Sequence, residues 1–250
     1  APTVKAFMSS MRTPSYVRLN QNETDTDYWI RGTLNNAMFN QFQERVSAID
    51  RNTNQLRIAK EDGNVDDQAR RAEYMPPNIG RFKLVNSIYE LDGPGEYYFD
   101  RGQKLVYFFP PDKLAGNRPY VSMTAGPIVN MVGVKYLDFQ GFLIEGGRQH
   151  GIKVTNGTSV IVRGNEIRNC GQDGVHVFGG NAVTIKSCHI YDTAESGIHL
   201  EGGIRSSLTR GNHLAENNYI HHVGAVQPYY RPCIRIKGFG LTARGNELAY

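Results

Sequence analysis

Residues 151–200 read GIKVTNGTSVIVRGNEIRNCGQDGVHVFGGNAVTIKSCHIYDTAESGIHL, and this stretch contains one pattern three times. Gly151, Gly174 and Gly197 stand 23 residues apart, and each opens a short run in which aliphatic and other side chains alternate. Alternation with a period of two is typical of a β-strand. The equal spacing therefore predicts strands that repeat in register along the chain.

Two further strands are expected in each repeat. Val160–Val162 and Val183–Ile185 alternate in the same way, and each is followed by a lone aliphatic residue, Ile167 and then Ile190. The template extends in both directions and gives five coils. Three short strands per coil without a helical signal predict an all-β fold, a parallel β-helix, and the preference of parallel crossovers predicts the right-handed form. A propeller needs about 40 residues per blade, and a sandwich does not keep equal spacing.

The coil that starts at Gly197 carries two predicted insertions. One covers residues 206–215, and the other is a Tyr- and Pro-rich loop over residues 223–232. Loops inserted on one face of a solenoid often form the walls of a binding site, although a surface insertion without function is also tolerated.

The first part of the chain does not repeat. It contains two predicted hairpins, at residues 46–58 and 96–108, and a pair of prolines closes the region. We therefore expect a small β-rich domain over residues 1–112 and the β-helix over residues 113–250.

The composition excludes several classes of protein. The 250 residues include 28 Lys and Arg against 24 Asp and Glu, and the basic residues are scattered. We therefore expect neither nucleic acid nor a membrane as a partner, and no apolar run approaches the roughly 18 residues of a membrane span. The three cysteines are too few for a disulfide framework, and no His/Cys pair has zinc-ligand spacing. No metal and no cofactor are expected.

Stacking in register aligns the outward side chains of successive coils in two outer rows, which lie two residues apart along the first strand of each coil. The first outer row is Asn130, Lys153, His176, His199 and Arg235, and the second is Val132, Thr155, Phe178, Glu201 and Lys237.

Asp173 and Glu195 precede the first strands of two neighbouring coils, which places them about one or two strand spacings apart. Glycoside hydrolysis uses two carboxyl groups about 5 to 9.5 Å apart, one as acid and one as nucleophile or base. Asp173 with Glu195 or Glu201 meets this requirement, so these three acids are the predicted catalytic residues. The predicted substrate-binding residues are His176, His199, Arg235, Tyr229, Tyr230 and Arg231.

A structural interpretation competes with this one. Outward ionisable rows are usually a solvated face, and polar residues in solenoid turns often bond their own backbone. Asn165, Asn218 and Asn246 fall at one turn of different coils and are predicted to be such a turn feature.

Five short motifs follow one another along the chain: Pro94-Gly-Glu-Tyr-Tyr-Phe-Asp-Arg101, Leu105-Val-Tyr-Phe-Phe-Pro-Pro111, Gly171-Gln-Asp-Gly-Val175, Tyr191-Asp-Thr-Ala-Glu-Ser-Gly-Ile198 and Glu216-Asn-Asn-Tyr-Ile-His-His222. Their order resembles the right-handed β-helix glycoside hydrolases of family 141 over nearly the whole chain. The resemblance implies a secreted enzyme that acts on polysaccharide side chains, with a β-rich insertion domain that leads into the helix.

Members of that family begin before this insertion domain and continue beyond the position of Tyr250, where a further coil carries an acidic motif. We therefore expect this chain to be an internal piece of such an architecture, with further coils or another chain stacked on its open ends. Two sequons, at Asn22 and Asn156, fit a secreted glycoprotein, although motifs this short also occur by chance.

Three functions remain open from the sequence. A glycoside hydrolase with a polysaccharide or glycan substrate is the leading expectation. A non-catalytic glycan-binding or structural solenoid is the first alternative. A polysaccharide lyase is the second, although a lyase usually holds calcium between clustered aspartates, which these coils lack.

Overall fold

The computed structural model describes residues 29–34, 41–50, 55–58, 79–100, 102–111, 120–226 and 229–249. Contacts divide the chain into two units, Ala1–Pro119 and Tyr120–Tyr250. The predicted linker over residues 112–119 lies outside the described residues, so the predicted domain boundary at residue 112 stays a prediction.

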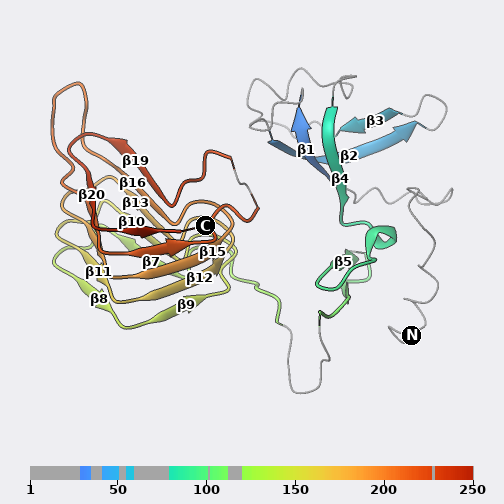
Figure 1. Ribbon diagram of the computed structural model, residues 1–250, viewed down its shortest axis with the longest axis horizontal. Helices are drawn as coiled ribbons and strands as arrows, with labels where there is room; N and C mark the ends of the chain where they lie inside the picture. Colours follow the sequence, from blue (N-terminus) through green and yellow to red (C-terminus); the bar gives the residue numbers. More distant parts are fainter. Residues whose placement is uncertain are drawn as a thin grey trace. The chain divides into compact units, whose positions relative to one another are not determined.

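The second unit is a parallel β-helix, as predicted. Its coils stack as parallel bands (Figure 1), and each coil contributes one strand to each of three five-stranded sheets. The first sheet contains β7 (Val129–Val132), β10 (Ile152–Thr155), β13 (Val175–Phe178), β16 (Ile198–Gly202) and β19 (Ile234–Gly238).

The other two sheets are built in the same way from the second and third strands of each coil. The second sheet contains β8 (Asp138–Gln140), β11 (Ile161–Arg163), β14 (Thr184–Lys186), β17 (Leu214–Glu216) and β20 (Thr242–Arg244). The third sheet contains β9 (Leu143–Glu145), β12 (Glu166–Cys170), β15 (His189–Thr193), β18 (Tyr219–His221) and β21 (Glu247–Leu248).

The register of the first sheet confirms the predicted repeat. Ile152 pairs with Val175, and Val175 pairs with Ile198, so inward side chains stack on one another in successive coils. All three are fully buried. Burial of such a side chain contributes about 1.5 to 3 kcal/mol, so the stacked aliphatic rows are the main source of stability.

Close packing of the coils explains the repeated glycines. A Cβ atom on Gly174 would lie 2.5 Å from Cγ2 of Ile190 and 2.8 Å from the carbonyl oxygen of Gly197. Gly151 and Gly197 are confined in the same way, by an isoleucine in the third strand of their own coil and by a backbone carbonyl of the coil that follows. Only glycine leaves room for the neighbouring coil at this position.

One predicted insertion has different bounds. We expected the extra residues to cover 206–215, but Leu214 and Ala215 belong to β17 and pair with Thr184 and Ile185 of β14. The inserted segment therefore ends before Leu214. The reason is that Ala215 takes the inward position of the strand, where it is fully buried.

The predicted asparagine turn feature is confirmed by its hydrogen bonds. Oδ1 of Asn218 accepts the backbone N–H of Cys188 at 3.0 Å, and Nδ2 donates to the carbonyl of Ile185 at 3.0 Å. Asn165 and Asn246 make equivalent contacts with the preceding coil. These side chains replace backbone hydrogen bonds at the corner between the second and third sheets.

The first unit contains a four-stranded sheet with the strand order β3-β2-β1-β4 and a separate hairpin of β5 and β6. Both predicted hairpins are confirmed as antiparallel pairs, β2 with β3 and β5 with β6. The elements of this unit are β1 (Trp29–Leu34), β2 (Gln41–Asp50), β3 (Gln55–Ile58), β4 (Ile79–Val85), the 3₁₀ turn η2 (Ile88–Glu90), β5 (Tyr97–Asp100) and β6 (Leu105–Phe108).

Two expectations from the composition can be compared with the structure. Within the described part of the chain, we find no helix with the length and apolarity that crossing a bilayer requires. Cys170, Cys188 and Cys233 are all free thiols, as expected from their number and spacing.

Candidate functional site

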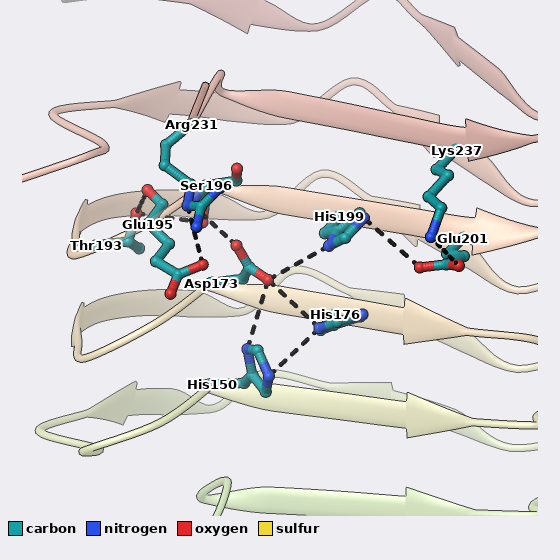
Figure 2. Close-up of polar contacts among 10 residues, drawn as sticks. All are labelled: His150, Asp173, His176, Thr193, Glu195, Ser196, His199, Glu201, Arg231 and Lys237. Atoms are coloured by element: carbon teal, nitrogen blue, oxygen red, sulfur yellow. Dashed lines mark hydrogen bonds and ion pairs between the residues drawn. The ribbon is translucent and has the colours of Figure 1, made fainter. Parts of the chain in front are cut away.

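Three histidines surround one carboxylate on the outward face of the first sheet (Figure 2). Oδ2 of Asp173 lies 3.5 Å from Nδ1 of His150, 3.4 Å from Nδ1 of His176 and 3.6 Å from Nδ1 of His199. Nδ1 of His176 is also 3.3 Å from Nε2 of His150. We call these four residues the histidine–aspartate cluster.

The coil register explains why these residues meet. His176 and His199 pair directly in β13 and β16, so their outward rings stack with centroids 4.5 Å apart. His150 and Asp173 occupy the same position in the template, immediately before the glycines that open β10 and β13. The turn therefore brings side chains from three coils to one place.

Asp173 is held by the backbone of the next coil. Its Oδ1 accepts the N–H of Ser196 at 3.0 Å, and only 3% of the residue is exposed. With Oδ2 facing the three rings, both of its oxygens are engaged. Asp173 is therefore placed to orient the histidines, not to contact a substrate itself.

The cluster shifts the ionisation of its own members. Burial by itself raises the pKa of Asp173, but the contact with His199, the charges on His150 and His199, and the N–H of Ser196 outweigh it and leave the pKa below its usual value. Burial and the mutual repulsion with His199 and His150 lower the pKa of His176 to about 4. Burial likewise lowers the pKa of His150. Asp173 thus lies beside two rings, His150 and His176, whose pKa values are lowered.

Glu195 lies at the start of the same coil as His199. Its Oε2 is 3.1 Å from Nε of Arg231, which comes from the loop between β18 and β19, and its side chain is 22% exposed. Burial raises the pKa of Glu195, the charge of Arg231 opposes this, and the charge of Asp173 adds to the rise. Glu195 is therefore an acid that holds its proton to higher pH than an ordinary glutamate.

Glu201 lies at the other end of β16. Its Oε1 binds Nζ of Lys237 on β19 at 2.7 Å, and its Oε2 is 4.0 Å from Nε2 of His199. His199 therefore stands between two carboxylates, Asp173 on its Nδ1 side and Glu201 on its Nε2 side. His199 of the first outer row therefore contacts both Glu201 of the second outer row and Asp173 in the preceding turn.

The structure brings most of the predicted site residues to one face. Asp173, His176, His199 and Glu201 form a continuous set of contacts, and Figure 2 shows Glu195 and Arg231 beside it.

The remaining predicted binding residues are Arg235, Tyr229 and Tyr230. Arg235 pairs with His199 in the sheet register, and its charge acts on Glu195. Tyr229 is half-buried, and Tyr230 is 74% exposed with a positive φ. No contact of either tyrosine with the predicted acids is found among the described residues.

Sequence reasoning missed His150. The signal was present, because Gln149-His150 precedes Gly151 as Gln172-Asp173 precedes Gly174. A histidine at the template position of Asp173, one coil earlier, has to lie beside the same face.

Only one of the two predicted glycosylation sites lies within the described residues. Asn156 is exposed at the end of β10, so its side chain is accessible, while Asn22 lies outside the described residues. Modification at both sequons stays a prediction.

Two sets of side chains in this region have the composition of a metal site. They are His150, Asp173 and His176, and His176, His199 and Glu201, and in each set one ligand atom per residue lies within 4.8 Å of the others. The arrangement can thus support proton transfer, metal binding or both.

Comparison with known proteins supports the fold. Residues 127–247 match a family model described as a right handed beta helix region. With the parallel stacking of the three sheets, this defines the second unit as a right-handed parallel β-helix, as the sequence predicted. Searches of curated proteins and of solved structures found no match. The resemblance to glycoside hydrolases of family 141 therefore rests on the sequence motifs alone.

Proposed function

We propose that this protein is a carbohydrate-active enzyme that hydrolyses glycosidic bonds of a polysaccharide on the outward face of the first sheet. The proposal is supported by the position of Glu195. This acid is half-buried, and its neighbour Ser196 donates its backbone N–H to Asp173 of the preceding coil. The pKa of Glu195 is raised by burial, while contacts within the cluster lower that of Asp173. Two acids whose environments separate their proton affinities are typical of acid–base catalysis.

Glu195 is the proton donor in this proposal. Cleavage of a glycosidic bond requires a proton on the departing oxygen, and a carboxylic acid with a raised pKa supplies it near neutral pH. The Arg231 guanidinium fixes the orientation of the carboxyl group and stabilises the carboxylate that remains after transfer.

The second group is the pair formed by Asp173 and His199. Asp173 contacts one nitrogen of His199 and orients the ring, as the carboxylate of a carboxylate–histidine pair does. Nε2 of His199 is buried and has no hydrogen-bond partner among the described residues, so in this proposal it takes a proton from an enclosed water molecule as the water oxygen bonds to the anomeric carbon. The glycosidic bond breaks, its oxygen takes the proton of Glu195, and solvent restores both groups.

The surroundings suit a sugar chain with polar substituents. Lys153 and Arg235 flank the two histidines in the first outer row, and Lys237 follows Glu201 in the second. Phe178 presents an exposed aromatic side chain in the same sheet. Basic side chains bind hydroxyl and carboxylate groups, and an aromatic face packs against a sugar ring. A secreted protein with a polysaccharide as its partner is part of this proposal.

The test is release of reducing ends from pectic, xylan and fucosylated polysaccharides. Wild-type protein is expected to release sugar from at least one of them, and Glu195→Gln is expected to lose about 100-fold or more of the rate. Glu216→Gln, which alters an ion-paired glutamate of the second sheet, is the matched control and should keep the wild-type rate. Binding without release would favour a glycan-binding solenoid, and a product with a new carbon–carbon double bond would favour a lyase. Either result would overturn the proposal.

A further inference from the structure

His150, Asp173 and His176 face one point from two neighbouring coils. Nδ1 of His150 and Nδ1 of His176 lie 3.5 Å and 3.4 Å from the same oxygen, Oδ2 of Asp173. An N–H···O hydrogen bond measures about 2.7 to 3.2 Å. The carboxylate therefore completes no short hydrogen bond with either ring, although all three groups converge.

The distances between these atoms match those between neighbouring ligand atoms of a tetrahedral zinc site. Zinc binds imidazole nitrogen and carboxylate oxygen at about 2.0 to 2.2 Å in tetrahedral geometry, which places neighbouring ligand atoms roughly 3.3 to 3.6 Å apart. The contacts of Oδ2 of Asp173 with the two rings have this length. One ligand atom from each of the three residues also lies within 4.8 Å of the other two.

Burial makes the arrangement costly without a bound group. Asp173 is 3% exposed and His150 is 8% exposed. Nδ1 of His150, the nitrogen that faces Oδ2 of Asp173, is buried and has no hydrogen-bond partner among the described residues. Buried polar atoms are normally satisfied, and an exception indicates a missing partner such as an ion.

We propose that His150, Asp173 and His176 bind one divalent transition-metal ion of the Zn²⁺ type. Two imidazole nitrogens and one carboxylate suit Zn²⁺ and Co²⁺, whereas Ca²⁺ and Mg²⁺ prefer oxygen ligands. Three protein ligands leave a coordination position open for water or substrate. The sequence predicts no metal because no His/Cys pair has zinc-ligand spacing, whereas in the structure His150 joins Asp173 and His176 from the preceding coil. This proposal goes beyond polysaccharide hydrolysis and does not depend on it.

The overlapping set of His176, His199 and Glu201 is the weaker site. Glu201 is already neutralised by Lys237 at 2.7 Å, and an ammonium group beside a ligand oxygen opposes the binding of a cation. Its side chain is also more exposed than that of Asp173, at 24% against 4%. We therefore assign the metal to the first set.

The first experiment titrates the chelator-treated 250-residue chain with Zn²⁺ by calorimetry and with Co²⁺ by visible absorption. One equivalent of each ion is expected to bind, and the Co²⁺ spectrum should show the intense bands of a four- or five-coordinate site with nitrogen ligands. Ca²⁺ and Mg²⁺ should not compete. Absence of Zn²⁺ binding by the wild-type protein, or equal binding of Ca²⁺, would overturn the proposal even if the enzyme hydrolyses polysaccharide.

The second experiment compares His150→Ala with Glu201→Gln, one residue from each set. Loss of an outer partner of a ligand costs 10- to 100-fold in affinity, so loss of His150 itself is expected to weaken Zn²⁺ binding at least about 100-fold. Glu201→Gln should keep the affinity within about tenfold. Circular dichroism of each variant establishes that it is folded, and Asp173→Asn is the isosteric substitute if His150→Ala does not fold. The reverse order of effects would show that the ligand set is wrong.

Discussion

Two groups of buried polar residues in the same β-helix differ in how completely they are satisfied. At the corner between the second and third sheets, the amide of Asn218 uses its oxygen and its nitrogen in hydrogen bonds of 3.0 Å to backbone groups. In the histidine–aspartate cluster, the three contacts to Oδ2 of Asp173 are 3.4 to 3.6 Å long. Buried nitrogens of His150, His176 and His199 have no hydrogen-bond partner among the described residues.

The completeness of hydrogen bonding distinguishes a buried polar group that stabilises the fold from one that serves a function. A buried amide whose groups are all satisfied stabilises the fold, since removing it leaves backbone donors and acceptors without partners. A buried cluster with unsatisfied nitrogens costs stability, and proteins retain such clusters where a ligand or a reaction needs them. Both groups repeat across coils, so repetition by itself does not distinguish them.

The largest expected effect separates the two groups by activity. Asp173→Asn keeps the oxygen that accepts the N–H of Ser196 but removes the charge that orients the histidines. We expect turnover of a polysaccharide substrate to fall about 100-fold or more, with little change in the free energy of unfolding. Steady-state kinetics and urea denaturation measure the two quantities. Asp138→Asn, in an exposed ion pair with Arg163, is the control and should leave turnover unchanged. Equal turnover in the two variants would remove Asp173 from the site.

The next effect is on stability. Asn218→Ala leaves the N–H of Cys188 and the carbonyl of Ile185 buried without their partner. We expect the free energy of unfolding to fall by about 2 to 4 kcal/mol, while turnover per folded molecule is retained. Asn130→Ala, at an exposed position of the first sheet, should change stability by less than about 0.5 kcal/mol. If the two variants unfold alike, the asparagines are not structural.

A smaller effect concerns pH. Glu195 has a raised pKa because it is buried, and the charge of Arg231 partly offsets the rise. Arg235 and His199 act in the same direction as Arg231, and the Asp173 carboxylate opposes them.

Arg231→Met removes the largest of the opposing charges, so the pKa of Glu195 rises further. A general acid works only while protonated, and activity is lost as pH rises through its pKa. The alkaline limb of the pH–rate profile is therefore expected to move to higher pH. Arg244→Met, which breaks an exposed pair with Glu216, should leave the profile unchanged. A shift to lower pH would exclude Glu195 as the proton donor.

The smallest expected effect, on the free energy of unfolding, directly compares the histidine–aspartate cluster with the asparagines. His176→Leu removes a buried Nε2 that lacks a hydrogen-bond partner, together with the long Nδ1 contacts to His150 and Asp173 at 3.3 and 3.4 Å, and places an apolar side chain of similar size there. In the presence of a chelator, the free energy of unfolding is expected to stay the same or rise by up to about 1 kcal/mol. A loss as large as that in Asn218→Ala, measured by urea denaturation, would show that the cluster is as structural as the asparagines.

Part of the site could be predicted because the fold is periodic. Once the 23-residue repeat is recognised, a residue's place in the repeat gives its coil, its sheet and its face. The repeat therefore predicts that His176, His199 and Glu201 lie together. The pairing of His176 with His199 and the 4.0 Å contact of Glu201 with His199 confirm this. The predicted end of the insertion at residue 215 is wrong, because Leu214 and Ala215 belong to a strand that pairs with β14.

Spacing alone did not predict how the turns direct their side chains. Asp173 is predicted to be a catalytic acid, yet its turn directs it under the neighbouring coil, where Ser196 binds it. His150 is not among the predicted site residues, although it stands at the same template position as Asp173. Turn residues lack the strict alternation of a strand, so their directions depend on the packing of adjacent coils.

The sequence by itself determined the coil, the strand register and the rows of outward residues, because a solenoid repeats the same local interactions at a fixed interval. Only the tertiary structure decided which acid is buried, which is ion-paired and which nitrogens lack partners. Those properties depend on contacts between residues that are 23 or more positions apart in the sequence, such as Ser196 with Asp173 and Arg231 with Glu195. Burial and charge in such contacts set proton and metal affinity, and no one-dimensional pattern encodes them.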